Sequence, residues 1–250
     1  MEEWWDKTLK VFFLLNFISL KWWNTMKKII ILVLTLINVL VLVTSINNKK
    51  IEPVSMSLNE KKIDIIEKNN YKIKVYIPIT NYKKLNKIIN KKIYEYINKF
   101  KSEISNEIPH NNQYYTLIIL YDEYSNNEYI SYIFRIEYYT GGAHPNHEIF
   151  TINYNTKTDN EIYLDFLEKK YKNVINTFSK ISRQELIKNP RIMDTNMLMD
   201  GTNPTASNFK NFVFSKAGII IFFPQYQVAP YSQGEFNVVI PYDKLEEIKW

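Results

Sequence analysis

Apolar and polar positions alternate in short runs between residues 60 and 160, with the two-residue period that is typical of β-strands. The pairs Asn69-Asn70 and Asn126-Asn127 each separate two such runs, as the turns of β-hairpins do. The sequence therefore predicts two hairpins and one further strand. The runs expected as strands are residues 63–66, 71–79, 114–124, 129–139 and 148–154.

Two longer stretches place apolar residues three or four positions apart, which predicts helices with one buried face. The first runs from residue 82 to 108 and ends before Pro109, and the second runs from 164 to 187 and ends at Asn189-Pro190. Proline ends a helix because it lacks the backbone N–H and its ring clashes with the preceding turn. The positions that share a face are Leu85, Ile88, Ile89, Ile93, Tyr96, Ile97 and Phe100 in the first stretch, and Leu167, Tyr171, Val174, Ile175, Phe178 and Ile181 in the second.

The remaining third of the chain predicts mainly strands. Residues 191–208 are polar and are expected to be irregular, residues 209–215 and 218–223 suit a hairpin, and residues 236–240 suit a last strand before a short C-terminal helix. Strands and helices thus follow one another in blocks. This order is typical of an α+β fold, with antiparallel sheets and segregated helices.

The N-terminal part predicts export. Residues 29–44 are apolar and uncharged, Lys27 and Lys28 directly precede them, and the small residue Ser45 follows. This is the pattern of a signal peptide, and an uncleaved membrane anchor has the same features. In both cases the two lysines stay on the cytoplasmic side. The chain is therefore expected to be secreted or held in the cell membrane through residues 29–44.

Residues 1–25 contain four tryptophans around a short apolar stretch. They suit an interfacial helix, or they precede a true start at Met26, where a complete signal sequence begins. With these segments assigned, we expect the following organisation: an uncertain segment at 1–25, a signal peptide or anchor at 26–45, a linker at 46–52, an N-terminal half at 53–145 and a C-terminal half at 146–250.

Composition excludes several kinds of site. The chain has no cysteine, which excludes disulfides, thiolate nucleophiles and zinc–thiolate centres. Its formal net charge is +6, carried mainly by lysines that are spread along the chain, whereas nucleic-acid binding favours clustered basic residues. No nucleic-acid partner and no cofactor are expected.

His144 and His147 have a spacing that can hold a metal when both lie on one helix. Gly141, Gly142 and Pro145 argue against a helix here, so no metal site is expected. The two glycines predict a tight structural turn instead. His144 either forms a hydrogen bond that fixes this turn or contacts a ligand.

Catalytic residues are not evident. The acidic pairs Asp122-Glu123 and Asp159-Glu161 lie at or beside predicted turns, where carboxylates are ordinarily solvated or capping. The chain has no G-x-S-x-G motif and no cysteine nucleophile. We therefore assign no catalytic residue.

The loop at residues 224–234 is the best candidate for a binding site. Pro224 and Pro230 stiffen it, which lowers the entropy cost of presenting a surface. Tyr226 and Tyr231 suit stacking on sugar rings or anchoring of a protein partner. The alternative is that both rings pack the loop onto the core, as large aromatic residues commonly do.

Two stretches resemble a known family. The first is the Gly-Gly-Ala-His segment at residues 141–144, and the second is Ala229-Pro230-Tyr231 followed by Gly234. Together they are similar to the extracytoplasmic domain family shared by the anti-sigma factor RsiV and the N-terminal part of the deacetylase PdaC. The resemblance covers about residues 55–248 and implies a mixed α+β domain outside the cytoplasm.

The chain departs from both complete architectures of that family. It has no room for a separate deacetylase domain, and residues 1–25 are short for a sigma-factor-binding segment. We therefore expect a non-catalytic module that binds or senses wall glycan or an envelope protein. An anti-sigma-type membrane regulator, and a wall-glycan hydrolase or deacetylase acting through His144, are the alternatives.

Overall fold

The computed structural model describes residues 60–67, 70–104 and 114–248. The chain divides into a unit at 1–51 and a unit at 52–250, and every described residue belongs to the second. The predicted signal or anchor segment at 26–45, and the segment before it, lie outside the described residues. In the part that is described, no helix combines the length and the apolar character that crossing a membrane requires.

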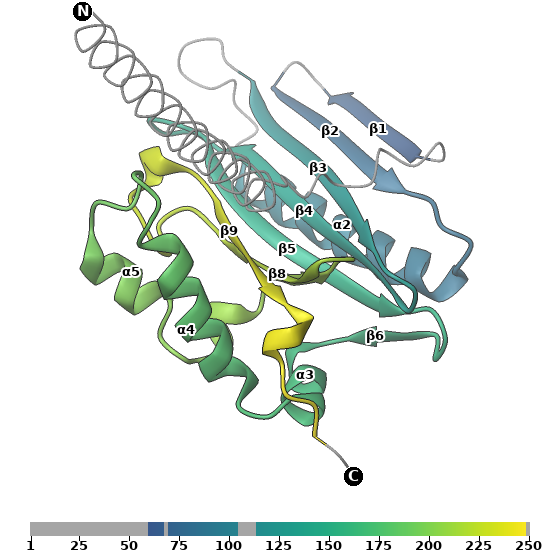
Figure 1. Ribbon diagram of the computed structural model, residues 1–250. Helices are drawn as coiled ribbons and strands as arrows, with labels where there is room; N and C mark the ends of the chain where they lie inside the picture. Colours follow the sequence, from purple (N-terminus) through teal and green to yellow (C-terminus); the bar gives the residue numbers. More distant parts are fainter. Residues whose placement is uncertain (1–59, 68–69, 105–113, 249–250) are drawn as a thin grey trace, which may run out of the picture. The chain divides into compact units, whose positions relative to one another are not determined.

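The fold is mixed α+β, as predicted, and its larger sheet has six strands in sequence order (Figure 1). The two hairpins predicted for this region are confirmed: β1 pairs with β2, and β3 pairs with β4. The strands are β1 (Glu60–Glu67), β2 (Tyr71–Pro78), β3 (Tyr115–Ser125), β4 (Tyr129–Tyr139), β5 (Asn146–Asn155) and β6 (Asn160–Ile162). The short β6 was not expected from the sequence.

One pairing in this sheet is parallel, which corrects the prediction of purely antiparallel sheets. β2 and β3 run in the same direction, whereas the other neighbours are antiparallel. Helix α2 (Lys83–Glu103) lies between these two strands in the chain. A strand that returns parallel to its predecessor needs such a crossover element, because a tight turn can only reverse the direction.

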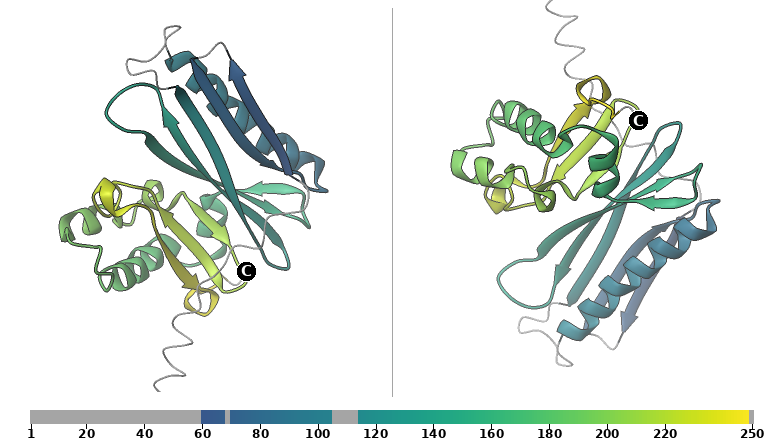
Figure 2. Two further views of the ribbon diagram at one scale, coloured as in Figure 1. Left: turned by 90° about the horizontal axis from the view of Figure 1, so that it is seen from above. Right: turned by 90° about the horizontal axis from the view of Figure 1, so that it is seen from below.

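Helix α2 covers one face of the six-stranded sheet (Figure 2). Its apolar stripe packs against the inward-facing residues of β2 to β5, and together they form one hydrophobic core. The predicted face is confirmed, although Ile88 and Tyr96 lie at its margin and are only half-buried. The helix residues that are buried are Leu85, Ile89, Ile93, Ile97 and Phe100.

The other face carries a second, three-stranded antiparallel sheet made of β7 (Phe212–Phe214), β8 (Gly218–Phe223) and β9 (Phe236–Pro241). All six residues of the central strand β8 are buried. Since neighbouring side chains of a strand point to opposite faces, β8 is covered on both sides. The first sheet lies on one side, and helix α4 packs on the other (Figure 2).

The predicted helix at 164–187 is wrong as a single element. It is divided into α3 (Leu164–Lys170) and α4 (Val174–Leu186). Between them, Tyr171 forms a β-bridge with Glu247, and Asn173 has a left-handed backbone with φ 49°. Asparagine tolerates this conformation better than most residues. The helical spacing continues through the break because both helices bury their apolar residues in the same core.

Residues 191–208, expected to be irregular, contain helix α5 (Thr195–Gly201) and a 3₁₀ turn at Ala206–Phe209. The side chain of Asp194 caps α5 by accepting hydrogen bonds from the backbone N–H groups of Asn196 and Met197, at 2.9 and 3.1 Å. The expected C-terminal helix is only a 3₁₀ turn at Tyr242–Lys244. Propensity alone missed α5 because the segment is short and mostly polar.

Two buried polar side chains join the sheets. The amide of Asn153 donates a hydrogen bond to the carbonyl oxygen of Phe212 at 2.9 Å, and the hydroxyl of Ser131 accepts one from the N–H of Phe214 at 3.0 Å. Ser131 lies on β4 and Asn153 on β5, so β7 crosses these two strands. The proposed division of the chain at 145/146 falls between β4 and β5, which pair along their whole length and form one sheet across it.

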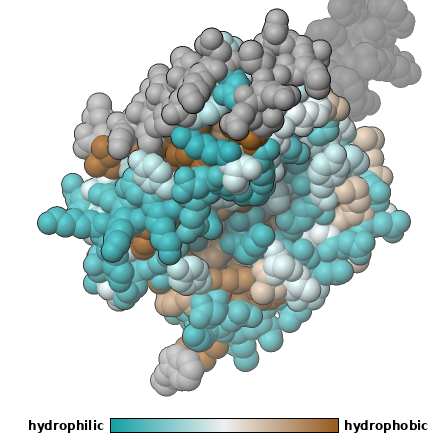
Figure 3. Space-filling view, turned by 180° about the vertical axis from the view of Figure 1, so that it is seen from behind, coloured by the Kyte–Doolittle hydropathy of each residue, from teal (hydrophilic) through white to brown (hydrophobic). Residues whose placement is uncertain are grey.

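The surface seen from behind is mainly hydrophilic, with apolar residues showing in a hollow near its centre (Figure 3). Most apolar side chains are instead in the two cores, one between α2 and the first sheet and one around the second sheet. The large apolar or aromatic side chains that remain exposed are therefore candidates for binding, because they do not pack in either core.

Candidate functional site

The two stretches that the sequence singled out lie against each other. The hydroxyl of Tyr231 donates a hydrogen bond to the carbonyl oxygen of Pro145 at 3.0 Å, across 86 residues of sequence. The ring of Tyr231 lies 4.8 Å from that of His144 and 5.8 Å from that of His147, between ring centroids. The Gly-Gly-Ala-His loop and the loop at 224–234 therefore form one surface.

The loop at 224–234 is anchored on both sides of Tyr226. Around it, the N–H of Gln227 donates to the carbonyl oxygen of Pro224 at 3.1 Å and closes a four-residue turn. After it, Val228 and Ala229 are buried in the core of the second sheet. The Gln227 amide also donates to the carbonyl oxygens of Gly201 and Asn208, at 2.8 and 2.9 Å. The loop conformation is thus fixed from several directions.

Tyr226 occupies the third position of this turn with φ +68°, a backbone conformation that usually belongs to glycine or asparagine. Its side chain is 62% exposed, and its ring lies 5.5 Å from that of Tyr231. Tyr231 is half-buried between the two loops, and neither ring belongs to the hydrophobic cores. The reading in which both tyrosines cap the core does not describe Tyr226.

The two prolines take different places. Pro224 is half-buried at the start of the turn, and Pro230 is exposed directly before the 3₁₀ turn at Tyr231–Gln233. The N–H of Gln233 donates to the carbonyl oxygen of Pro230 at 2.9 Å, which fixes the direction in which Tyr231 leaves the loop.

Gly141 and Gly142 both have positive φ, at +99° and +129°, which is the backbone that the predicted structural turn requires. The Tyr139 hydroxyl donates to the carbonyl oxygen of Gly142 at 3.1 Å. His144 Nδ1 lies 2.8 Å from the carbonyl oxygen of Pro145 and must therefore donate to it. The His144 ring is held by this bond and by Tyr231, while its side chain stays exposed.

A cavity of about 320 Å³ opens beside these rings, between β3 to β5 and the start of the 224–234 loop. Its polar wall contains Arg135, Glu137, His147, Gln225 and Glu235. His147 Nδ1 lies 3.9 Å from Glu137 Oε2, across the β4–β5 pair. The Gln225 Oε1 atom is buried and has no hydrogen-bond partner among the described residues. The half-buried carboxylate of Glu137 on the same wall is an acceptor that a ligand with hydroxyl or amide hydrogens can use.

Arg135 organises the floor of this cavity. Its guanidinium donates two hydrogen bonds to Glu235, at 2.9 and 3.0 Å, and another to Asp122 on β3. Burial lowers the pKa of Arg135, but the hydrogen bonds and charges of Glu235 and Asp122 outweigh it and raise the pKa overall. The arginine stays charged and fixes both carboxylates, so the 224–234 loop is tied to the first sheet at this point.

His144, through which the hydrolase or deacetylase alternative would act, lies at the surface. His144 and His147 are both exposed, so in the described part of the chain they form no buried histidine–carboxylate pair. No group of three His, Asp or Glu side chains that could hold a metal is found among the residues described. Exposed rings and fixed carboxylates can stack on a sugar and accept hydrogen bonds from its hydroxyls.

Sequence reasoning found the aromatic half of the site and missed its polar half. Arg135, Glu137, Gln225 and Glu235 were not singled out. A partial signal exists for the first two, because they are charged residues at alternate positions of a strand whose neighbours are apolar. Such a pattern indicates a face that is not simply buried, but it does not reveal which loop lies over it.

Two protein families match consecutive parts of the chain. Residues 66–147 match the family described as deacetylase PdaC, and residues 149–243 match a family described as a protein of unknown function, DUF3298. The chain is 31% identical over 120 residues to the peptidoglycan-N-acetylmuramic acid deacetylase PdaC of Bacillus subtilis strain 168. This match covers 48% of the chain and 26% of that enzyme, so the chain spans about a quarter of its length.

One solved structure shows the same fold, and a second is less similar. A DUF3298 family member from Bacteroides fragilis NCTC 9343 has a TM-score of 0.52 at 16% identity, covering 77% of this chain and 93% of that one. A DUF3298 family protein from Pseudomonas aeruginosa PAO1 has a TM-score of 0.47 at 12% identity, with coverages of 75% and 92%. The matches support the PdaC-like part of the predicted resemblance, while the anti-sigma part stays a prediction.

Proposed function

We propose that this chain is an exported, non-catalytic module that binds glycan of the cell envelope at the surface formed by the 141–147 and 224–234 loops. The observation that carries this proposal is the exposed ring of Tyr226, held on a left-handed backbone beside Tyr231 and His144. A strained backbone that displays an aromatic ring to solvent is costly, and it persists where the ring has a use outside the fold.

The chemistry of the surface suits a sugar polymer. Tyrosine rings present flat apolar faces that stack on the C–H faces of sugar rings. Beside them, Glu137 and Glu235 are half-buried acceptors for sugar hydroxyls, and Arg135 fixes the second of these. The rigid anchoring of the loop lowers the entropy that binding must overcome.

The similarity to a peptidoglycan-modifying enzyme supports the envelope polymer as the ligand. The Bacillus subtilis protein is named as a peptidoglycan-N-acetylmuramic acid deacetylase, and this chain aligns with only a quarter of it. We propose that the shared part contributes contact with the envelope polymer rather than the deacetylation. Export through residues 26–45 completes this proposal, since it brings the module to the polymer.

The binding test uses the full chain, kept in non-ionic detergent because residues 29–44 are apolar. It is incubated with purified peptidoglycan, with and without teichoic acid, and the bound fraction is measured after sedimentation. Tyr226→Ala is expected to weaken binding about fivefold, since one aromatic contact contributes roughly 1 kcal/mol. The melting temperature should stay nearly unchanged, because the side chain is 62% exposed.

Tyr94→Ala is the matched control. Tyr94 is 45% exposed on α2, which covers the opposite face of the first sheet, so its loss should leave glycan binding intact. A stable Tyr226→Ala variant that binds each envelope fraction as the wild type does would contradict the glycan proposal. Loss of capture for an envelope protein alone would favour the protein-partner alternative.

Export is tested separately. Residues 26–50 are fused to a reporter that is active only outside the cytoplasm. An active reporter is the expected result, and an intact but silent fusion in the cytosol would contradict export while leaving the binding result to stand by itself.

A further inference from the structure

Strand β5 has an open edge. On one side it pairs with β4 from Asn146 to Asn155. On the other side β6 pairs only with its last three residues, Asn153–Asn155. Among the described residues no strand pairs with positions 146–152 on that side. An unpaired edge of this kind is a template for a further strand.

The register shows which backbone groups face outward. The N–H of Thr156 donates to the carbonyl oxygen of Glu128 at 2.9 Å, which extends the β4–β5 ladder by one hydrogen-bonded pair. In an antiparallel ladder such pairs alternate, so Ile152 and Phe150 also bond to β4. Ile149 and Thr151 therefore direct their N–H and C=O groups away from β4, toward the open edge.

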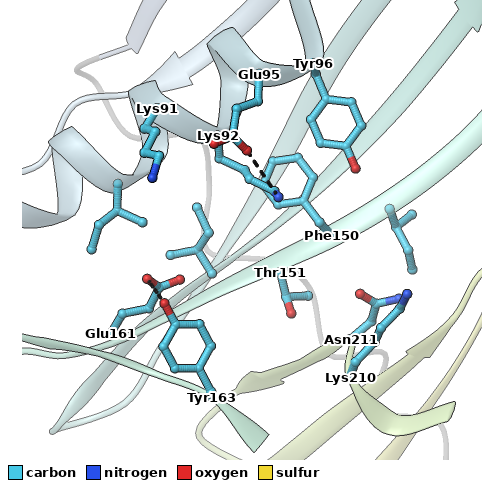
Figure 4. A pocket seen from close by; sticks show the side chains of 13 residues that line it. Lys91, Lys92, Glu95, Tyr96, Phe150, Thr151, Glu161, Tyr163, Lys210 and Asn211 are labelled. Atoms are coloured by element: carbon cyan, nitrogen blue, oxygen red, sulfur yellow. Dashed lines mark hydrogen bonds and ion pairs between the residues drawn. The ribbon is translucent and has the colours of Figure 1, made fainter. Parts of the chain in front are cut away.

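A cavity of about 540 Å³ follows this edge (Figure 4). Four consecutive residues, Ile149 to Ile152, line it. Because consecutive side chains of a strand point to opposite faces, a cavity that touches all four lies alongside the strand rather than over one face. Helix α2 bounds it from one face of the sheet, and Lys210 and Asn211 bound it from the other.

The rim of the cavity is positively charged. Glu95 pairs with Lys92 at 3.4 Å, and Glu161 accepts a hydrogen bond from the Tyr163 hydroxyl (Figure 4). Lys91 and Lys210 are exposed and have no ion-pair partner within the described ranges. Three lysines therefore face two carboxylates, so the rim has a net positive charge and complements negative charge.

We propose that the open edge of β5 binds an extended, acidic segment of a partner protein, which adds to the sheet as a further strand in line with β6. The outward backbone groups of Ile149 and Thr151 pair with the backbone of the segment, and Lys91 and Lys210 select its acidic side chains. Tyr163, which is 61% exposed at the end of the cavity, provides an aromatic contact. A backbone-lined edge favours a peptide over a polyanion, which carries no matching row of amides.

The test uses the full chain, labelled with ¹⁵N, and an eight-residue peptide of alternating valine and aspartate. Hydrogen exchange of single amides is followed by NMR with and without the peptide. The amides of Ile149 and Thr151 should gain protection. Those of Phe150 and Ile152 should not change, because β4 already protects them. A peptide that leaves Ile149 and Thr151 unprotected overturns the proposal.

Thr151→Pro removes the outward N–H without breaking the β4 ladder, since proline is tolerated at edge positions that face solvent. Peptide affinity should fall about tenfold or more with the loss of this bond. Thr151→Val, which keeps the N–H, should bind as the wild type does. Equal affinity of the proline and valine variants, with both melting as the wild type does, overturns the proposal.

Charge is tested by Lys91→Glu and Lys210→Glu, each expected to weaken binding about fivefold. Lys180→Glu makes the same charge change on an exposed position of α4 and should have no effect.

Two further probes test the role of the backbone. The proposal is overturned if an N-methylated peptide binds as tightly as the parent peptide, or if polyphosphate binds and the peptide does not. The proposal is also overturned if the wild-type chain forms a dimer that the Thr151→Pro substitution dissociates, because the strand bound at the β5 edge would then come from a second copy of the chain.

Discussion

At the scale of single residues, Tyr226 combines features that rarely occur together. Its backbone is left-handed, its ring is exposed, and its neighbours on both sides are fixed. A tyrosine at this turn position costs roughly 1 kcal/mol or more relative to glycine. The fold itself gains little from the ring, because it belongs to neither hydrophobic core.

Replacing Tyr226 by glycine should therefore separate folding from binding. We expect Tyr226→Gly to leave the free energy of unfolding unchanged or to raise it by up to about 1 kcal/mol, because relief of backbone strain offsets the added freedom of the unfolded chain. Tyr226→Ala should be the less stable of the two, and both should lose glycan binding equally. Denaturant unfolding measures the first quantity. A loss of more than about 1 kcal/mol in the glycine variant would mean that the ring packs onto the fold.

Tyr163 offers a prediction about pH. Its hydrogen bond to Glu161, together with burial and the charge of Glu161, raises the pKa of Tyr163 from 10.0 to about 12. A raised folded-state pKa means that the contribution of this bond to folding is complete below pH 10 and is lost as the pH rises through about 12. Glu161→Gln should lower the pKa of Tyr163, as followed by NMR of ¹³Cζ-labelled tyrosine. Glu95→Gln, on the opposite rim, should leave it unchanged.

At the scale of elements, the 224–234 loop depends on the end of α5. Gly201 ends that helix, and the carbonyl oxygen of Gln227 lies 1.9 Å from the place where a Cβ on Gly201 would be. The Gln227 amide in turn bonds to the Gly201 carbonyl oxygen. This close approach is possible only for glycine, so the helix end and the binding loop are built as one piece.

Gly201→Ala should accordingly destabilise the protein by about 2–3 kcal/mol, because backbone must move to admit the methyl group. Gly142→Ala is the comparison: its Cβ has no atom within 4 Å, so only its φ of +129° is costly, at about 1 kcal/mol. Thermal melts of both variants decide the order. A Gly142→Ala variant that loses more than Gly201→Ala would show that the contact with Gln227 is not the stronger constraint.

At the scale of the whole molecule, Arg135 connects the two sheets. It lies on β4, bonds to Asp122 on β3, and holds Glu235, the residue directly before β9. Its guanidinium also lies 5.8 Å from the ring centroid of Phe222 on β8. The aromatic loop is thereby fixed relative to the first sheet, which is what brings Tyr231 against His144.

Arg135→Met should reduce stability by about 1–2 kcal/mol, because it leaves the half-buried carboxylates of Asp122 and Glu235 without their partner. The loss is no larger because all three side chains are partly exposed to solvent, which screens their charges. In a double-mutant cycle with Glu235→Gln, the two losses should not add, because one interaction is counted twice. Lys169→Met breaks a fully exposed pair with Asp165 and should leave stability nearly unchanged. Additive losses at Arg135 and Glu235 would contradict the coupling.

The sequence by itself determined the local features. Alternation located β1 to β5, helical spacing identified the buried face of α2, and paired glycines indicated the turn at Gly141 and Gly142, because each pattern reports how one segment meets a core. It also marked the tyrosines and His144 through a family resemblance.

Tertiary structure alone decided how these pieces meet. It broke the 164–187 helix at Asn173, placed β2 parallel to β3, and left β5 with an open edge. It also brought Tyr231 within hydrogen-bond distance of the Pro145 carbonyl oxygen, and Arg135 within hydrogen-bond distance of Glu235. Periodicity shows which side of an element is buried, whereas these contacts join residues up to 100 positions apart and depend on register and packing between whole sheets.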